Sequence, residues 1–249
     1  KISAVIITLN EERYIERCIR SLLKVSNEIL VVDSFSTDKT EEICKKYDVK
    51  FIQHPFKGFG QQKQYGVLQA TYDWILSLDA DEALSDELID NLLEIKENAT
   101  YDIYSFNRMM NYCGKWIKYG AWYPEKKVRL FNRKKTTWSD NYVHETVLLR
   151  KDLKQKHLEG YLYHYNYLNI EEHVLQMNKF STLSAEEMFK KDKKISLLLM
   201  FFKSSWRFIY EYVFRLGFVD GYEGLKIALI HSFYTKMKYL KLYDLNHKK

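Results

Sequence analysis

Short apolar runs and helically spaced segments alternate along the first third of the chain. The apolar runs, rich in β-branched residues, predict strands at 2–9, 28–32, 50–53 and 74–78. Between them, apolar residues recur every three or four positions, which predicts helices at 10–23, 39–47 and 61–70. Strands that alternate with helices pair in parallel and carry the helices on their faces. The pattern therefore predicts an α/β fold with a mostly parallel sheet flanked by helices.

Polar clusters follow three of these strands, at 8–12, 33–38 and 79–82. In open α/β sheets, ligands bind in the crevice beyond the carboxyl ends of the strands, so we expect the three clusters to converge there. Neither G-x-G-x-x-G nor G-x-x-x-x-G-K follows the first strand, so dinucleotide and P-loop sites lose their main support. The clusters therefore favour a nucleotide or sugar-phosphate site.

Asp79 and Asp81 stand where the fourth predicted strand ends. Strand geometry points alternate side chains the same way, so the two carboxylates would lie together. A hard cation such as Mg²⁺ or Mn²⁺ prefers oxygen ligands and keeps part of its coordination shell for substrate phosphates. The alternative is that this acidic stretch caps a helix that begins near Ser85.

The later part of the chain has a less regular pattern. Strand-like runs stand at 102–107 and 128–132, and 171–191 has the pattern of a helix. Two apolar-rich segments follow, at 195–216 and 225–245.

Composition indicates a folded protein from a reducing compartment. Of the 249 residues, 46% are hydrophobic and only two are prolines, which argues against disorder and a stiff linker. The three cysteines are widely spaced and form no Cys-x-x-Cys, so neither a disulfide framework nor a zinc site is expected. The first residues do not have the pattern of a signal peptide, and a cytoplasmic location is expected.

The net charge of +6 is concentrated at the end of the chain. Residues 1–189 hold 26 basic and 28 acidic side chains, whereas residues 190–249 hold 13 basic and 5 acidic ones. We therefore expect a catalytic domain at 1–189 and a basic helical tail at 190–249. Nucleic acid is not an expected partner, because the basic residues of the tail are interleaved with bulky aliphatic ones.

The first tail segment carries four charged residues spaced by four: Lys203, Arg207, Glu211 and Arg215. On a helix they form one stripe, with ion pairs Arg207–Glu211 and Glu211–Arg215. A membrane-spanning helix would bury this stripe at a cost of several kcal/mol per charge, so an amphipathic helix is favoured. Such helices suit an anionic membrane surface. The alternative is that they pack on the catalytic domain or on a second subunit.

Three motifs, V-I-I-T-L-N-E-E at 5–12, V-V-D-S-F-S-T-D-K-T at 31–40 and L-S-L-D-A-D-E at 76–82, resemble the nucleotide-sugar half of glycosyltransferase family 2. The resemblance is greatest to a small bacterial group that adds a hexose to the lipopolysaccharide core, and it extends to V-R-L-F at 128–131, V-H-E at 143–145 and H-Y-N-Y at 164–167. It implies a GT-A fold, with a Rossmann-like nucleotide-sugar half and a C-terminal helical appendage, and sugar transfer with inversion.

The resemblance also implies a role for particular residues. It places Thr8, Asn10 and Glu12 at the rim of the nucleotide pocket. It places Asp33 beside the nucleobase, and Asp79 beside the ribose and the metal. Asp81 would be the direct ligand of Mg²⁺ or Mn²⁺, which would stabilise the departing diphosphate. Lys63 would contact the phosphates or the donor, with a solvated helix position as the alternative. Arg129 would contact the diphosphate or order the acceptor loop, and His164 would reach the metal or the diphosphate or else belong to the core.

Inversion needs one base to take the proton of the acceptor hydroxyl. The resemblance assigns this role to Glu145, with Asp140 as the local competitor and a structural ion pair as the alternative. We expect transfer of a hexose, glucose by the resemblance, from a UDP-linked donor to a cell-surface glycan or a lipid-linked acceptor at the inner face of the cytoplasmic membrane. The alternatives are transfer to a polyprenyl phosphate, which needs no base, and a non-catalytic sugar-nucleotide-binding or scaffold protein.

Overall fold

The computed structural model describes residues 1–139 and 146–247. The chain folds into two compact units, one of residues 1–108 and 125–165 and the other of residues 109–124 and 166–249. This division differs from the boundary after residue 189 that the charge distribution suggested. Helix α5 (Ile170–Lys190) packs along α7 (Gly221–His247) and so belongs with the tail helices.

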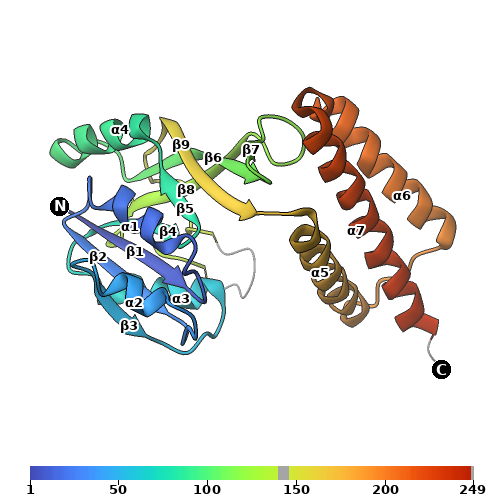
Figure 1. Cartoon of the computed structure of the whole chain (residues 1–249), viewed down its shortest axis with the longest axis horizontal. Helices are drawn as coiled ribbons and strands as arrows, with labels where there is room; N and C mark the ends of the chain where they lie inside the picture. The colour runs from blue at the N-terminus through green and yellow to red at the C-terminus, as the bar shows by residue number, and fades with distance from the viewer. Residues whose placement is uncertain (140–145, 248–249) are drawn as a thin grey trace. The chain divides into compact units, whose positions relative to one another are not determined.

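The first unit is built on a parallel half-sheet followed by an antiparallel half. Strands β1 (Ile2–Thr8), β2 (Glu28–Asp33), β3 (Lys50–Gln53) and β4 (Trp74–Asp79) pair in parallel in the order β3-β2-β1-β4. The sheet continues beyond β4 through β8 (Glu125–Asn132), β6 (Ile103–Tyr112), β9 (Gln155–Tyr167) and β5 (Glu82–Leu84). Because β8 runs antiparallel to β4 and to β6, the sheet is mixed, and its parallel part is the half with the βαβ sequence pattern (Figure 1).

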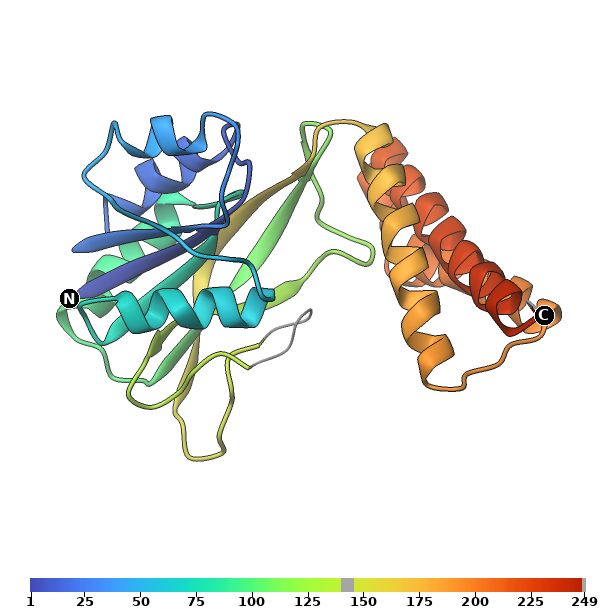
Figure 2. The same cartoon turned by 90° about the horizontal axis from the view of Figure 1, so that it is seen from below.

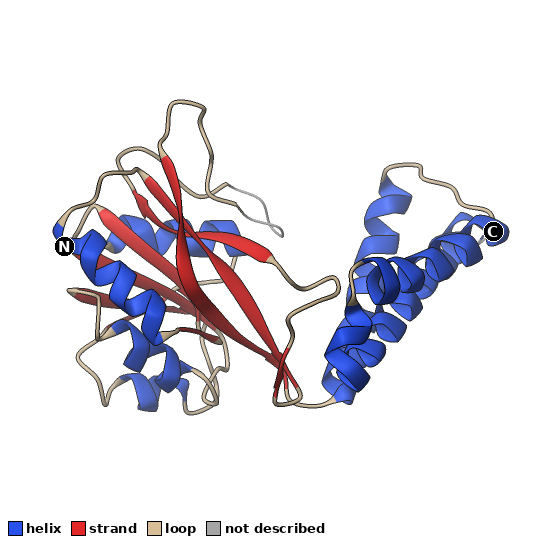
Figure 3. Cartoon of the chain, turned by 90° about the horizontal axis from the view of Figure 1, so that it is seen from above, coloured by secondary structure: helices blue, strands red, loops and turns tan. Residues whose placement is uncertain are grey.

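Helices cover both faces of this sheet, as the alternation of buried residues along β1 requires (Figure 3). Ala4 and Ile6 face a core that contains residues of α1 (Ile15–Leu22) and α4 (Asp86–Glu97). Val5 and Ile7 face a second core with Val67 of α3 (Phe59–Gln69). A short helix α2 (Thr40–Cys44) follows β2.

Helix α3 approaches the sheet so closely that only a glycine fits at the contact. A Cβ atom built on Gly66 would lie 2.4 Å from Cγ1 of Val5. Any larger residue would push α3 away from β1, and α3 carries the predicted donor-site residue Lys63.

Most predicted elements are present with shifted ends. The helix expected near Ser85 begins there, because the Ser85 side chain accepts a hydrogen bond from the backbone N–H of Leu88 at 3.2 Å. The run at 102–107 is the first part of β6, which is ten residues long and pairs with the two-residue strand β7 (Lys115–Trp116) at its far end. The predicted segment 195–216 is not one helix. It consists of α6 (Leu197–Ile209) and a π-helical turn at Tyr210–Phe214.

The second unit consists of α5, α6, α7, a 3-10 turn at Gly217–Asp220 and the hairpin at the far end of β6 (Figure 2). The Asp220 carboxylate caps the hairpin, accepting from the backbone N–H groups of Lys118 at 3.1 Å and Tyr119 at 2.8 Å. None of the helices within the described ranges has both the length and the apolar character that crossing a bilayer requires.

One of the two predicted ion pairs of the tail is present. Arg207 pairs with Glu211. The second pair, Glu211–Arg215, is wrong: Arg215 donates instead to the carbonyl oxygens of Gly120 and Tyr123, and Glu211 pairs with His231. The π-helical turn shifts the register, and both side chains therefore meet other partners.

Candidate functional site

The ends of three parallel strands bring the predicted polar clusters together. Thr8 at the end of β1 is in register with Asp33 at the end of β2, and Ile7 is in register with Asp79 at the end of β4. The three clusters therefore lie at one edge of the sheet, as the strand order requires.

The loops after β1 and β2 are joined by hydrogen bonds. Oδ1 of Asn10 accepts from the backbone N–H of Thr37 at 2.8 Å, and Oε2 of Glu12 accepts from that of Lys39 at 3.0 Å. Asn10 has a φ of 57°, a left-handed conformation that asparagine tolerates better than most residues. Both side chains are exposed on the loop that follows β1.

Asp33 and Thr8 lie deeper. Asp33 is fully buried, and its carboxylate accepts from the backbone N–H and the hydroxyl of Ser36, which fixes the turn after β2. The hydroxyl oxygen of Thr8 is buried without a hydrogen-bond partner among the described residues. A buried hydroxyl that lacks a partner is unfavourable, so Thr8 is suited to meet a polar group of a ligand.

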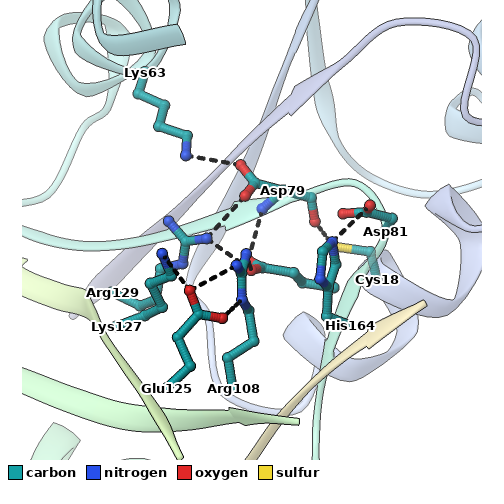
Figure 4. Close-up of polar contacts among 10 residues, drawn as sticks. Cys18, Lys63, Asp79, Asp81, Arg108, Glu125, Lys127, Arg129 and His164 are labelled. Atoms are coloured by element: carbon teal, nitrogen blue, oxygen red, sulfur yellow. Dashed lines mark hydrogen bonds and ion pairs between the residues drawn. The ribbon is translucent and has the colours of Figure 1, made fainter. Parts of the chain in front are cut away.

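Two cations hold Asp79 (Figure 4). Nζ of Lys63 lies 2.9 Å from Oδ1 of Asp79, and Nη2 of Arg129 lies 2.8 Å from Oδ2. Burial alone would raise the pKa of Asp79, but Lys63 and Arg129 outweigh it and hold the pKa well below its usual range. Lys63 is 1% exposed, which excludes the alternative of a solvated helix position.

Glu82, to which the sequence analysis gave no role, contacts the cluster of Lys63, Asp79 and Arg129. It is buried, and its Oε2 accepts from the backbone N–H of Asp79 at 3.0 Å. Its Oε1 lies 2.7 Å from Nη2 of Arg129 and 3.4 Å from Nη1 of Arg108. Arg108 in turn pairs with Glu125 at 2.8 Å. The residues thus form a chain of alternating charges in which each cation has an acidic partner.

Asp81 is held separately. Its Oδ2 lies 2.9 Å from Nε2 of His164 on β9, and its backbone carbonyl accepts from the N–H of Tyr165 at 3.0 Å. Burial opposes protonation of His164, but the Asp81 carboxylate outweighs it and raises the pKa of the imidazole. His164 is buried, as the alternative of a core histidine expected, but its ring also points at Asp81 (Figure 4).

Negative charge gathers around Asp81. Burial, followed by the charges of Asp81 and Asp38, raises the pKa of Glu11 to about 8. Asp79 is balanced by Lys63 and Arg129, whereas among the described residues the ion-pair partner of Asp81 is His164. The acidic excess is therefore on the Asp81 side of the site.

This donor set fits a divalent cation that takes most of its ligands from substrate. Within the described ranges, no group of three or more His, Cys, Asp or Glu side chains is arranged to hold a metal ion. Asp81 and His164 supply one carboxylate and one imidazole, and the oxygens of a diphosphate would complete the shell.

Glu145, the predicted catalytic base, lies outside the described residues, as do Asp140 and His144. The residues on either side are described. Trp138 forms a bridge with Val147, and the backbone N–H of Ser139 donates to the carbonyl of Thr146 at 2.8 Å. The Trp138 ring is 4.8 Å from Nζ of Lys63, so residue 138 contacts a side chain of the Asp79 cluster.

Sequence comparison places these residues in context. The family described as Glycosyl transferase family 2 matches residues 3–156. An uncharacterized glycosyltransferase of Rickettsia typhi is 33% identical over 100% of this chain and 88% of its own length. The lipopolysaccharide core biosynthesis glycosyltransferase LpsC of Rhizobium meliloti is 31% identical over 98% of this chain and 92% of its own length.

Among solved structures, TarS of S. aureus, residues 1–349 in complex with UDP-GlcNAc, aligns with 98% of this chain and 89% of its own chain. The TM-score of that alignment is 0.48 and the identity is 15%.

Proposed function

The chain belongs to glycosyltransferase family 2 and has its GT-A fold, and from this premise we propose that it transfers a hexose from a UDP-linked donor to a hydroxyl of a lipopolysaccharide core or related cell-surface glycan. The relative LpsC, alike over nearly its whole length, supports the acceptor class. Glucose is the proposed sugar, with inversion at the anomeric carbon.

The observation that carries this proposal is the Lys63–Asp79–Arg129 cluster beside Asp81 and His164. When the bond between sugar and diphosphate breaks, negative charge develops on the leaving group. Lys63 and Arg129 are cations fixed at that edge of the sheet before any substrate binds. Because the surrounding charges already orient them, they need little reorganisation to stabilise the diphosphate.

Asp81 and His164 would hold a divalent cation, Mg²⁺ or Mn²⁺, at the acidic side of the site. Bound there, the ion would neutralise part of the diphosphate charge. Asp79 would keep Lys63 and Arg129 in place beside the ribose and phosphates. Thr8, Asn10 and Glu12 would contact the nucleotide from the rim, and Asp33 would hold the turn that meets the base.

Glu145 is the proposed base, because V-H-E at 143–145 resembles the motif of the lipopolysaccharide core group. It would take the proton from the acceptor hydroxyl as that oxygen attacks from the face opposite the diphosphate. The acceptor is proposed to be lipid-linked, and the protein to lie at the inner face of the cytoplasmic membrane.

Calorimetric titration of the purified chain with UDP-glucose, UDP-galactose, UDP-N-acetylglucosamine and GDP-sugars, with and without Mn²⁺, tests the proposal. We expect one UDP-sugar to bind and Mn²⁺ to strengthen its binding about tenfold or more. Asp81→Asn should remove the Mn²⁺ effect, and Asp90→Asn, at an exposed aspartate of α4, should leave it unchanged. Failure of every activated sugar to bind in either condition would overturn the proposal.

A further inference from the structure

The charged side chains of α6 and of the π-helical turn after it are bound to other parts of the second unit. All four charged side chains in Leu197–Arg215 contact protein atoms. Glu211 is 2% exposed and lies 2.7 Å from Nδ1 of His231, and Arg207 pairs with the same carboxylate. Arg215 donates to backbone carbonyls, and Nζ of Lys203 lies 3.3 Å from the hydroxyl of Tyr239.

The opposite face of the same segment is apolar and exposed. Met200 and Ser204 are buried, and the positions about half a turn away carry only large apolar side chains. These are Leu198, Phe202, Trp206, Ile209 and Val213, with exposed fractions of 81, 65, 49, 42 and 49%. Their spacing of three or four residues places them in one row, which we call the outer row.

We propose that the outer row inserts into the surface of an anionic lipid bilayer, with α6 lying in the plane of the interface. The inference rests on the proposed function, because a lipid-linked acceptor would be presented at that surface. It deepens that proposal by assigning the membrane contact to the outer row. A helix whose charged side chains contact the rest of its unit and whose large apolar side chains are exposed matches a solvent of low polarity on its apolar side.

Charge favours a lipid surface as the occupant. Residues 190–249 carry 13 basic and 5 acidic side chains. Lys193 and Lys194 are exposed immediately before α6, and Lys236 of α7 lies 4.8 Å from the ring of Phe201. Lysines beside an apolar face would meet anionic headgroups while the row enters the acyl region. Trp206 and Tyr210 are residue types that concentrate at membrane interfaces.

A second copy of this chain is a poorer fit. A twofold contact places the same patch of both subunits face to face. The basic residues beside the outer row of both copies would then be gathered at one interface, and like charges repel.

Sedimentation of the 249-residue chain with phospholipid vesicles tests the inference. We expect binding to vesicles that contain phosphatidylglycerol, weaker binding to pure phosphatidylcholine, and a decrease with added salt. The double variant Phe202→Gln/Trp206→Gln should bind about tenfold or more weakly, since two large apolar side chains no longer enter the bilayer. The matched control is Leu68→Gln/Leu93→Gln, which changes exposed leucines of the first unit and should bind like the wild type.

A spectroscopic test does not need the double variant to fold. Brominated phospholipids should quench part of the tryptophan fluorescence of the wild type, and Trp206→Phe should lose that quenched part. Unchanged vesicle binding by the double variant, or equal quenching in Trp206→Phe, would overturn the inference. So would a wild-type dimer that the double variant converts to a monomer in light scattering, because that result assigns the row to a second copy.

Titration with UDP-sugars in the absence of vesicles separates the two proposals. If a UDP-sugar binds and vesicles do not, only the membrane inference fails. If vesicles bind and no activated sugar does, the proposed transferase function fails.

Discussion

Arg129 uses a single nitrogen, Nη2, to contact both Asp79 and Glu82, at 2.8 and 2.7 Å. Asp79 stands at the end of β4, and Glu82 is buried. Glu82 also accepts from the backbone N–H of Asp79. The position of the Asp79 carboxylate is therefore set from two sides, by its own backbone and by the guanidinium that it shares with Glu82.

Replacing Lys63 with methionine tests the cation on the other side of Asp79. The variant keeps the length of the side chain and removes the charge, so the pKa of Asp79 should rise and the fold should lose about 3 kcal/mol of unfolding free energy. Affinity for UDP should fall about tenfold because one cation no longer faces the diphosphate. Urea unfolding and calorimetry measure the two effects.

The matched control is Lys24→Met, which removes the cation of an exposed pair with Asp86. Exposed pairs contribute about 0–1 kcal/mol, so both quantities should stay near their wild-type values. Equal effects of the two substitutions would contradict the role given to Lys63.

Glu82→Gln tests the buried acid of the charge chain. Glutamine has nearly the same shape as glutamate, but it is neutral, so Arg129 and Arg108 would lose the buried carboxylate that both of them contact. We expect a loss of about 3 kcal/mol in urea unfolding. Glu125→Gln removes a charge from the same chain where the side chain is 31% exposed, and should cost about 1 kcal/mol. A larger loss in Glu125→Gln than in Glu82→Gln would contradict this order.

The second unit should lose stability in mild acid because of His173. The ring is fully buried and stacks on Tyr167, and burial followed by the charge of His231 lowers the pKa of His173 to about 3. The unfolded chain binds the proton below pH 6.5 and the folded chain does not, so stability decreases as the pH falls from 6.5 towards 3. At pH 5 the loss should be about 2 kcal/mol relative to pH 7.

Urea unfolding of the wild type and of His173→Phe at pH 7 and pH 5 measures this loss. The variant should show a pH dependence smaller by that amount, whereas His247→Phe, at an exposed histidine of α7, should match the wild type. The same pH dependence in His173→Phe and in the wild type would show that His173 is not the responsible group.

The parallel half of the fold could be predicted because its signal is local. Each strand from β1 to β4 is a short apolar run, and the order of elements implies the parallel pairing. The boundary of the second unit could not be predicted, because it depends on β6 extending past Arg108 into a hairpin that Asp220 caps from 101 residues away. The charge of a segment gives no information about such a contact.

The site could be predicted only in part for the same reason. Asp79 and Asp81 were expected to point the same way from one strand, but β4 ends at Asp79 and Asp81 lies in the turn after it, so the alternation of a strand does not extend to Asp81. Asp79 pairs with Lys63 and Arg129, whereas Asp81 pairs with His164.

Arg108 and Glu125 are 17 residues apart and meet only because β6 and β8 pair in the register Arg108↔Glu125. Glu82 stands in the same motif as Asp81, but its burial and its ion pair with Arg129 depend on the packing of β5 in the folded sheet, so no role for its carboxylate could be predicted from the sequence.

Glu145→Gln distinguishes a hydroxyl acceptor from a phosphate acceptor. Glu145 and its competitor Asp140 lie outside the described residues, so kinetics must decide between them. If Glu145 takes the proton of a hydroxyl, the variant should bind UDP-sugar normally while kcat falls about 10²–10⁴-fold. Asp140→Asn should then retain most of the activity, as should Glu159→Gln at an exposed position of β9. Nearly full activity in Glu145→Gln would favour a polyprenyl phosphate acceptor, because an anionic oxygen attacks without a base, and loss of activity only in Asp140→Asn would move the base to Asp140.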